Sequence, residues 1–278
     1  MKNFSIALAA ICLGSWGSAA SAQTASSSGF ALDVNQTVTA PLATTVTVDI
    51  GPLAQTSGTA PPDYNVSNSV ASVNESIALT SGLLGVSEQL TTGLLTSNST
   101  GTATGAQATA TINNLSLGLG TDTFISSLFN ISATTIQSFS QANTVGGFDA
   151  SGTTTIEGLV LGGSAFGALV FDGSLFVNPA PNTVLFSGGG LSIILNEQIL
   201  SANGITTNAI NIGFTDFPIG TGLQNGNIIL AQTQASATAG ATGAVPEPAT
   251  WAMMLIGFGA IGATMRRRNK LQAAPQAA

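Results

Sequence analysis

The sequence predicts an all-β body, built as a β-sandwich or as a β-meander or solenoid-like sheet, between an export signal and a C-terminal transmembrane helix. Short apolar runs bounded by Gly and Asn recur between residues 23 and 245, whereas long runs with helical spacing are scarce. Several runs alternate between apolar and polar residues, as half-buried strands do. Asp-Gly or Asn-Gly pairs accompany three of the runs, and these dipeptides favour tight hairpin turns.

Residues 1–22 have the organisation of a secretory signal peptide. Lys2 supplies the positive start, a short apolar stretch follows, and Ala20 and Ala22 form a small-residue cleavage site. The apolar stretch is too short to span a membrane as a helix. We therefore expect signal peptidase to cut after Ala22, which leaves Gln23 as the new N-terminus of an exported protein.

The first half of the body, which we place over residues 23–230, shows one clear strand and one loop. Residues 45–50 alternate strictly between Thr or Asp on one face and Val or Ile on the other, which predicts a half-buried strand. Residues 51–62 contain three Pro and are expected to form a loop. Residues 53–123 lack Phe, so they are either a thinner second β layer or a flexible stretch.

The second half of the body has the stronger core signal. Ten of the eleven Phe residues of the body lie between Phe124 and Phe217, so we place the best core at residues 124–230. Apolar residues between 125 and 139 lie near helical spacing, and a short helix or another strand fits them equally. Hairpin turns are predicted at Asp172-Gly173, Asn203-Gly204 and Asn225-Gly226.

The C-terminal region contains a spacer followed by a membrane segment. Residues 231–245 are rich in Ala, Thr, Gln and Gly and are expected to be a flexible spacer. Residues 249–265 form an apolar run whose helix would be about 26 Å long, just enough for a bilayer core. Trp251 suits the outer boundary of that helix. Basic residues that stay on the cytoplasmic side follow it at once, before the tail 271–278: Arg266, Arg267, Arg268 and Lys270.

The same region resembles a known sorting signal, the PEP-CTERM motif in its PEPxxWAMM form. Pro246, Glu247 and Pro248 are followed by Trp251-Ala-Met-Met, an apolar helix and an Arg cluster, in the order of that signal over residues 246–270. An ordinary membrane anchor requires neither the Pro-Glu-Pro nor a Trp at this spacing. The three ordered parts make the resemblance specific, although it covers only the last part of the chain.

The resemblance implies that an exosortase, a membrane enzyme of Gram-negative bacteria, recognises Pro246, Glu247 and Pro248 and cuts the chain nearby. It also implies passage through the inner membrane to the cell surface or extracellular matrix, in association with exopolysaccharide and biofilm. The motif residues are then acted upon and are not catalytic. The body, including its run from Gly188 to Gln198, is similar to the exported choice-of-anchor domains, which imply no known activity.

The distribution of charge excludes several function classes for the body. Only 6% of the residues are charged, against about 25% in an average soluble domain. Between Gln23 and Val245 there are eleven acids and no Lys, Arg or His, so the body carries a charge of −11 from its side chains. It therefore has no cations for nucleic-acid phosphates, no P-loop Lys, no His or Cys for zinc and no His for a Ser-His-Asp triad.

Carboxylates are the remaining candidates for chemistry, and no pattern in the sequence pairs them. A glycan hydrolase needs two facing carboxylates, and the body offers scattered ones that we interpret as turn formers and solubilising charges: Asp149, Glu157, Asp172, Glu197 and Asp216. Calcium is the one metal compatible with an acid-only body, and residues 146–152 weakly resemble a Gly-Asp calcium loop. We expect no metal or cofactor and a non-enzymatic surface or matrix protein. The alternatives are an adhesin or glycan-binding module and a carboxylate-dependent glycan hydrolase.

Overall fold

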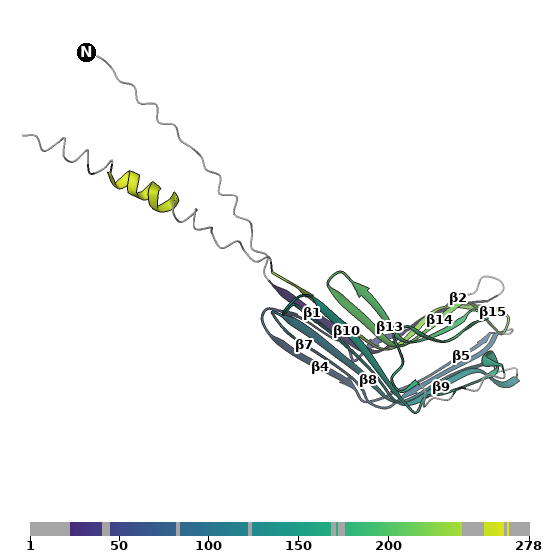
Figure 1. Cartoon of the computed structure of the whole chain (residues 1–278). Coiled ribbons are helices and arrows are strands. Elements are labelled where there is room, and N and C mark those ends of the chain that lie inside the picture. Colours follow the sequence, from purple (N-terminus) through teal and green to yellow (C-terminus); the bar gives the residue numbers. More distant parts are fainter. Residues whose placement is uncertain are drawn as a thin grey trace, which may run out of the picture. The chain divides into compact units, whose positions relative to one another are not determined.

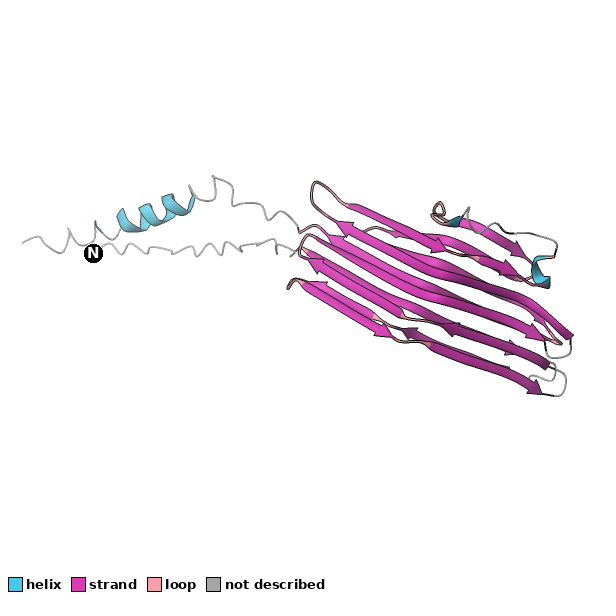
Figure 2. Cartoon of the chain, turned by 90° about the horizontal axis from the view of Figure 1, so that it is seen from below, coloured by secondary structure: helices cyan, strands magenta, loops and turns pink. Residues whose placement is uncertain are grey.

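The computed structural model describes residues 23–40, 45–81, 84–121, 124–167, 171, 176–240, 253–263 and 266. The chain divides into two units: residues 23–239, which form the body, and the two ends of the chain. The body is all-β, as predicted, and its described residues form two antiparallel sheets and include a short 3₁₀ turn, η1, at Ser164–Phe166 (Figures 1 and 2).

The first sheet, sheet A, contains both ends of the body. Its strands follow the order β12 (Thr183–Gly188), β13 (Leu191–Ser201), β14 (Gly204–Ile219), β15 (Gly222–Thr238), β1 (Thr24–Thr39) and β2 (Thr45–Leu53), with β3 (Thr56–Ala60) also paired to β1. In the β1–β15 pair the Cα partner of Thr24 is Thr238. The first and last strands of the body therefore lie side by side, and both ends of the body leave from the same place.

The second sheet, sheet B, is built around two long central strands. Its strands are β10 (Asp149–Glu157), β9 (Phe124–Asn143), β8 (Gly105–Thr121), β6 (Leu84–Thr92) and β5 (Val73–Ser81) in that order, with β7 (Leu95–Thr102) between β8 and β4 (Tyr64–Val70), and β11 (Val160–Gly162) on β9. Strand β8 pairs β7 through its first half and β6 through its second half. The weakly apolar stretch before residue 123 is therefore a β layer and not a flexible segment.

Sheets A and B pack face to face as a sandwich. Strands β1 and β15 of sheet A approach β8 of sheet B, and β14 approaches β9 and β10. Figure 1 shows β2, β14 and β15 on one side of the body, with β5 and β9 on the other. Of the architectures left open by the sequence, the sandwich is the one observed, because each sheet has one buried face that the other covers.

A kink crosses sheet A at mid-strand. Asn196 in β13 and Ala231 in β15 have φ angles of 49° and 52°, and both lie beside the line of Cα partners Leu195–Ile210–Leu230. At this level two consecutive residues are buried in each of these strands, Leu195 with Asn196 and Leu230 with Ala231. The inward-facing set of residues therefore shifts by one position, which divides the sandwich into two halves.

The two halves have different interiors. In the half that contains Thr24 and Thr238, called the hydroxyl half, the buried layer consists mainly of small residues, including Ser27, Thr56, Ser97, Ser99, Ser138, Ser140, Thr207, Thr233, Ala25, Ala106, Ala108, Ala142, Ala235 and Ala237. The other half, called the apolar half, contains the large side chains, including Leu117, Phe129, Leu191, Ile193, Ile212, Phe214, Phe217 and Ile228. This division explains why one part of a long strand has small Ala, Ser or Thr residues facing inward while another part of the same strand carries large apolar ones, as in β9 and β14.

The hydroxyl half is held together by hydrogen bonds between the sheets. Ser140 of β9 donates to Thr207 Oγ1 at 2.9 Å and to the carbonyl oxygen of Thr233 at 3.1 Å, and Ser138 shares a 2.7 Å bond with Thr233 Oγ1. These side chains are fully buried. Because a buried hydroxyl without a partner costs free energy, this pairing makes a polar interlayer tolerable. A second such group joins Thr56, Ser97 and Ser99.

Several predicted elements are confirmed. Strand β2 includes residues 45–50 with Val48 buried and the Thr residues beside it exposed. A β13–β14 turn is present at the predicted place, but it lies at Ala202 and Asn203, one residue before the predicted pair, between the Cα partners Ser201 and Gly204. Residues 125–139, for which helix and strand were both open, belong to strand β9. The Asp172-Gly173 turn lies outside the described residues.

The loop predicted at residues 51–62 is wrong for most of its length. Strand β2 continues to Leu53 and β3 covers residues 56–60, so within this range the chain leaves the strands only at Ala54 and Gln55 and again at residues 61–62. Residues Ala25 to Gly29 of β1 pair with β3. Pro52 is tolerated because it lies exposed in an edge strand, where its missing N–H breaks no ladder.

The turn predicted at Asn225-Gly226 is also wrong. The β14–β15 turn lies at Gly220 and Thr221, between the Cα partners Ile219 and Gly222. Asn225 and Gly226 instead lie inside β15, opposite a bulge in β14. Gly226 has a φ of 120° there, and a Cβ atom would collide with the backbone of β1, so glycine serves close strand packing and not a turn.

Two boundaries of the body also need correction. Residues 231–238, predicted as part of a flexible spacer, are the second half of β15, with Ala231, Ala235 and Ala237 buried against sheet B. Their small side chains match the hydroxyl half, whose composition resembles that of a spacer. The core also extends beyond residues 124–230, because strands before them contribute buried Leu, Val and Ile side chains: Leu32, Val34, Leu90, Leu95, Ile112 and Leu117.

Candidate functional site

The predicted signal peptide ends where the described part of the body begins. Gln23 is the first described residue, and its side-chain amide donates a hydrogen bond to Thr144 Oγ1. Ala20 and Ala22 lie outside the described residues, so the cleavage site remains a prediction. The structure shows that Gln23 directly precedes β1.

The C-terminal tail is described only over part of its predicted helix. Residues 253–263 are helical with exposed side chains, and Arg266 is helical and exposed. Among the described residues no helix is long and apolar enough to cross a membrane. The remaining predicted tail residues lie outside the description: Pro246, Glu247, Pro248, Trp251, Arg267, Arg268 and Lys270.

The acids proposed as candidates for hydrolysis are dispersed over the body. Asp149 and Glu157 lie at opposite ends of β10, and Asp172 lies outside the described residues. Glu197 of β13 accepts hydrogen bonds from two Asn side chains of β14 at 2.7 and 2.8 Å. Asp216 lies in the β14 bulge. Among the four of these carboxylates that the structure describes, no two share a contact or a cavity.

The segment with a weak resemblance to a calcium loop lies at the start of β10. Residues 146–152 form the turn between β9 and β10 and the start of β10, with Asp149 exposed. Within the part of the chain that the structure describes, no group of three acidic residues could hold a metal ion. Asp33 of β1 has a raised pKa because it is partly buried and lies near Asp49 of β2.

One ionisable group was missed by the sequence reasoning. Glu88 of β6 is only 7% exposed and faces sheet A, where Gln36 of β1 donates to its Oε1 at 3.4 Å. Burial raises the pKa of Glu88 to about 7, and the hydrogen bond from Gln36 lowers it by less. Gln224 of β15 in turn donates to Gln36 Oε1. The sequence pattern could have indicated this burial, because in a strand Glu88 lies on the same face as the apolar residues Val86 and Leu90.

The outer face of sheet B in the hydroxyl half carries an unusually uniform surface. Cα partners across β4, β7, β8, β9 and β10 form rows that cross the sheet, called rungs, and every second rung points its side chains outward. Three successive outward rungs form the surface that we call the amide face. The rungs are Asn65–Thr100–Gln107–Gln141–Ser151, Ser67–Asn98–Thr109–Phe139–Thr153 and Ser69–Thr96–Thr111–Gln137–Thr155. Every member is Ser, Thr, Asn or Gln, except Phe139. No charged side chain lies in these rungs.

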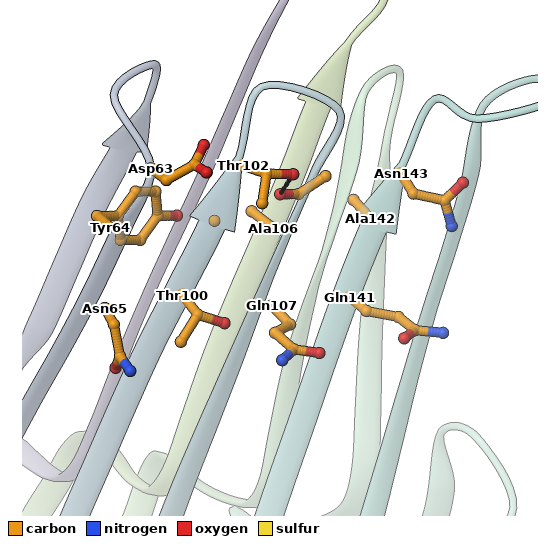
Figure 3. A pocket seen from close by; sticks show the side chains of 12 residues that line it. Asp63, Tyr64, Asn65, Thr100, Thr102, Ala106, Gln107, Gln141, Ala142 and Asn143 are labelled. Carbon is orange, nitrogen blue, oxygen red and sulfur yellow. Dashed lines mark hydrogen bonds between the residues drawn. The ribbon is translucent and has the colours of Figure 1, made fainter.

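Two hollows lie on the amide face. The first hollow has a volume of about 420 Å³, and Figure 3 shows the residues that line it. It lies above the backbone of Gly101, Ala106 and Ala142, which are Cα partners whose side chains do not point outward. The second, of about 450 Å³, lies farther along β4 and β7, between Ser69 and Asn98. Cavities of this size fall in the range of small-ligand sites.

Part of the first hollow has unused hydrogen-bonding capacity. Gln141 Nε2 donates to Ser151 Oγ at 2.9 Å, which fixes its amide. By contrast, the side chains of Thr100, Gln107 and Asn143 make no hydrogen bond with any other described residue. These groups are therefore available to a ligand from solvent, whereas in the sandwich interior nearly all polar side chains are paired.

With these positions established, comparison with known proteins decides the nature of the tail. Residues 244–268 match the family model of the PEP-CTERM protein-sorting motif. The chain carries a PEP-CTERM sorting motif. Neither a curated protein nor a solved structure matches the chain. The resemblance of the body to choice-of-anchor domains therefore stays a prediction.

The PEP-CTERM match has consequences for the fate of the chain. The motif implies export of the body, anchoring through the C-terminal tail before processing, and exosortase as the processing partner. The matched range contains Pro246, Glu247, Pro248 and Trp251 and reaches into the Arg cluster. The sequence interpretation of the tail is thus confirmed at the level of the motif, and the finer roles of its residues belong to the proposal below.

Proposed function

We propose that the protein is an exported, non-enzymatic component of the cell surface or extracellular matrix. In this proposal the helix at residues 249–265 holds the newly exported chain in the inner membrane, with Arg266 to Lys270 on the cytoplasmic side. An exosortase recognises Pro246, Glu247 and Pro248 and releases the body, which then associates with exopolysaccharide and biofilm. The PEP-CTERM match at residues 244–268 carries the proposal.

The body's structure supports this role. All eleven acids of the body, and none of the basic residues, lie between Gln23 and Val245, so the released part would be uniformly acidic and well solvated. Its first and last strands are adjacent, so a chain tethered through either end is held at the same end of the sandwich. The dispersion of the carboxylates favours a structural or binding role over hydrolysis. If hydrolysis occurs nevertheless, Glu197→Gln would reveal it through loss of that activity.

Replacing the Pro-Glu-Pro residues tests the sorting step. In cells with their own exosortase, the combined change of Pro246, Glu247 and Pro248 to Ala is expected to leave most of the chain in the inner membrane with its tail attached, because the recognition residues are absent. Thr250→Ala, at a position that the PEPxxW pattern leaves open, serves as the matched control and should be processed normally. Immunoblots of membrane, surface and medium fractions measure both. Normal release of the triple variant would contradict the proposed roles of these three residues.

A binding role on the surface, as an adhesin or glycan-binding module, is the second candidate function. It is favoured by one observation, the uncharged amide face with its two hollows. The carboxylate-dependent hydrolase is not favoured by any arrangement of the described residues.

A further inference from the structure

The amide face differs in charge from the rest of the body. The acids nearest to it lie at its margins, with Asp63 at the edge of the first hollow and Asp149 and Glu157 at the two ends of β10. Between them the three rungs present only neutral donors and acceptors. An anionic ligand would meet only acidic neighbours here, and a cationic ligand would find no carboxylate within the rungs. The charge pattern therefore selects a neutral, hydrogen-bonding ligand.

The shape of the face favours an extended ligand. The two hollows follow one another along β4 and β7 on the same side of sheet B. Neighbouring strands lie about 4.8 Å apart, so each rung offers regularly spaced amides and hydroxyls. A polymer with a repeated hydroxyl pattern can use several such groups at once, whereas a small solute would use one hollow only.

One aromatic side chain lies within this polar array. Phe139 points outward from β9, with Thr109 and Thr153 as its Cα partners, and it is only partly exposed. Its rung is the one whose Ser67, Asn98 and Thr109 line the second hollow. Its neighbours Ser138 and Ser140 point inward. An apolar ring beside amides and hydroxyls provides a flat surface for the C–H face of a sugar, while the polar groups bind its hydroxyls.

We propose that the amide face is a binding site for a neutral polysaccharide chain. Gln107 and Thr100 supply free hydrogen-bonding groups in the first hollow, and Gln141 is held in place by Ser151. Phe139 provides the apolar contact beside Thr109 of the second hollow. This inference gives the second candidate function a location and a ligand class. It does not depend on how the tail is processed.

Binding is tested with the full exported chain in native gels that contain a neutral polysaccharide (dextran, laminarin or galactomannan) or the acidic polysaccharide alginate. We expect at least one neutral polymer to retard the chain and alginate to have no effect. The double variant Gln107→Ala/Gln141→Ala, and separately Phe139→Ala, should weaken retardation about tenfold or more, because each removes central contacts. Gln234→Ala, an outward Gln on sheet A, is the matched control and should bind normally.

Three results would overturn the proposal. The first is a lack of retardation by all the neutral polymers, and the second is equal binding by the amide-face variants, whose folding is checked by circular dichroism. The third is sedimentation showing that the face joins two copies of the chain and that the variants dissociate them. Because tail processing is measured separately in cell fractions, failure of this inference leaves the sorting proposal standing, and the reverse also holds.

Discussion

Raising the pH from 4.5 to above 7 is expected to lower the free energy of unfolding by about 3 kcal/mol through Glu88 alone. The pKa of Glu88 is about 7 in the folded chain and near its ordinary value of 4.5 in the unfolded chain. The folded state therefore binds the extra proton between these two values. The stabilisation is fully present below pH 4.5, is lost as the pH rises, and is gone above pH 7.

Glu88→Gln isolates this contribution. The neutral amide has a similar shape and avoids a buried charge, so the variant should be more stable than the wild type above pH 7 and nearly equal to it at pH 4.5. Urea unfolding at both pH values gives the two free energies. Glu75→Gln, an exposed acid on the neighbouring strand β5, is the control and should keep the wild-type pH dependence. The assignment fails if Glu88→Gln and the wild type lose stability in parallel as the pH rises.

The second large effect is expected in the hydroxyl half. Ser140→Leu should destabilise the body by about 3 kcal/mol or more, because the larger side chain must enter a layer made of small residues and because Thr207 and Thr233 lose a hydrogen-bond partner. Thermal and urea unfolding followed by circular dichroism measures the loss.

The same substitution on the opposite face provides the control. Ser132 lies on β9 as well, but its side chain is on the outer face, paired in register with Ser116 and Val160. Ser132→Leu should change stability by less than about 1 kcal/mol. Equal losses from the two substitutions would show that the narrow interior of the hydroxyl half is not what limits side-chain size.

Local patterns in the sequence predicted the class of fold but not its arrangement. Strict alternation at residues 45–50 and the Asn203-Gly204 dipeptide act through neighbouring residues; the strand was predicted correctly and the turn to within one residue. The pairing of β1 with β15 joins residues about as far apart as the body allows, so no local pattern reports it. The Asn225-Gly226 error has the same origin, because Gly226 is required by the backbone of β1 and not by a turn.

The kink and the small residues of the hydroxyl half are two further features that local sequence patterns do not show. Alternation is interrupted where Asn196 and Ala231 adopt left-handed backbone conformations, so the inward-facing set changes within a strand. A strand of Ala, Ser and Thr also looks like a spacer when its partner sheet is unknown, as at residues 231–238. Small residues become a recognisable core only when a second layer of small residues faces them.

The candidate sites also differ in whether local sequence can show them. The sorting motif is a continuous stretch, so its residues could be recognised directly in the sequence. The amide face draws on five strands, from Asn65 to Thr155, and exists only through their register. Glu88 stood in an inward position that the alternation could have indicated, but its Gln partners come from β1 and β15.

The intact mass of the mature protein, taken together with its location in its own cell, tests the central proposal most directly. Export and exosortase processing predict a surface or extracellular protein whose chain begins at Gln23 and ends near Pro246 to Pro248. A chain that still carries residues 249–278 and remains in the inner membrane would contradict the proposal.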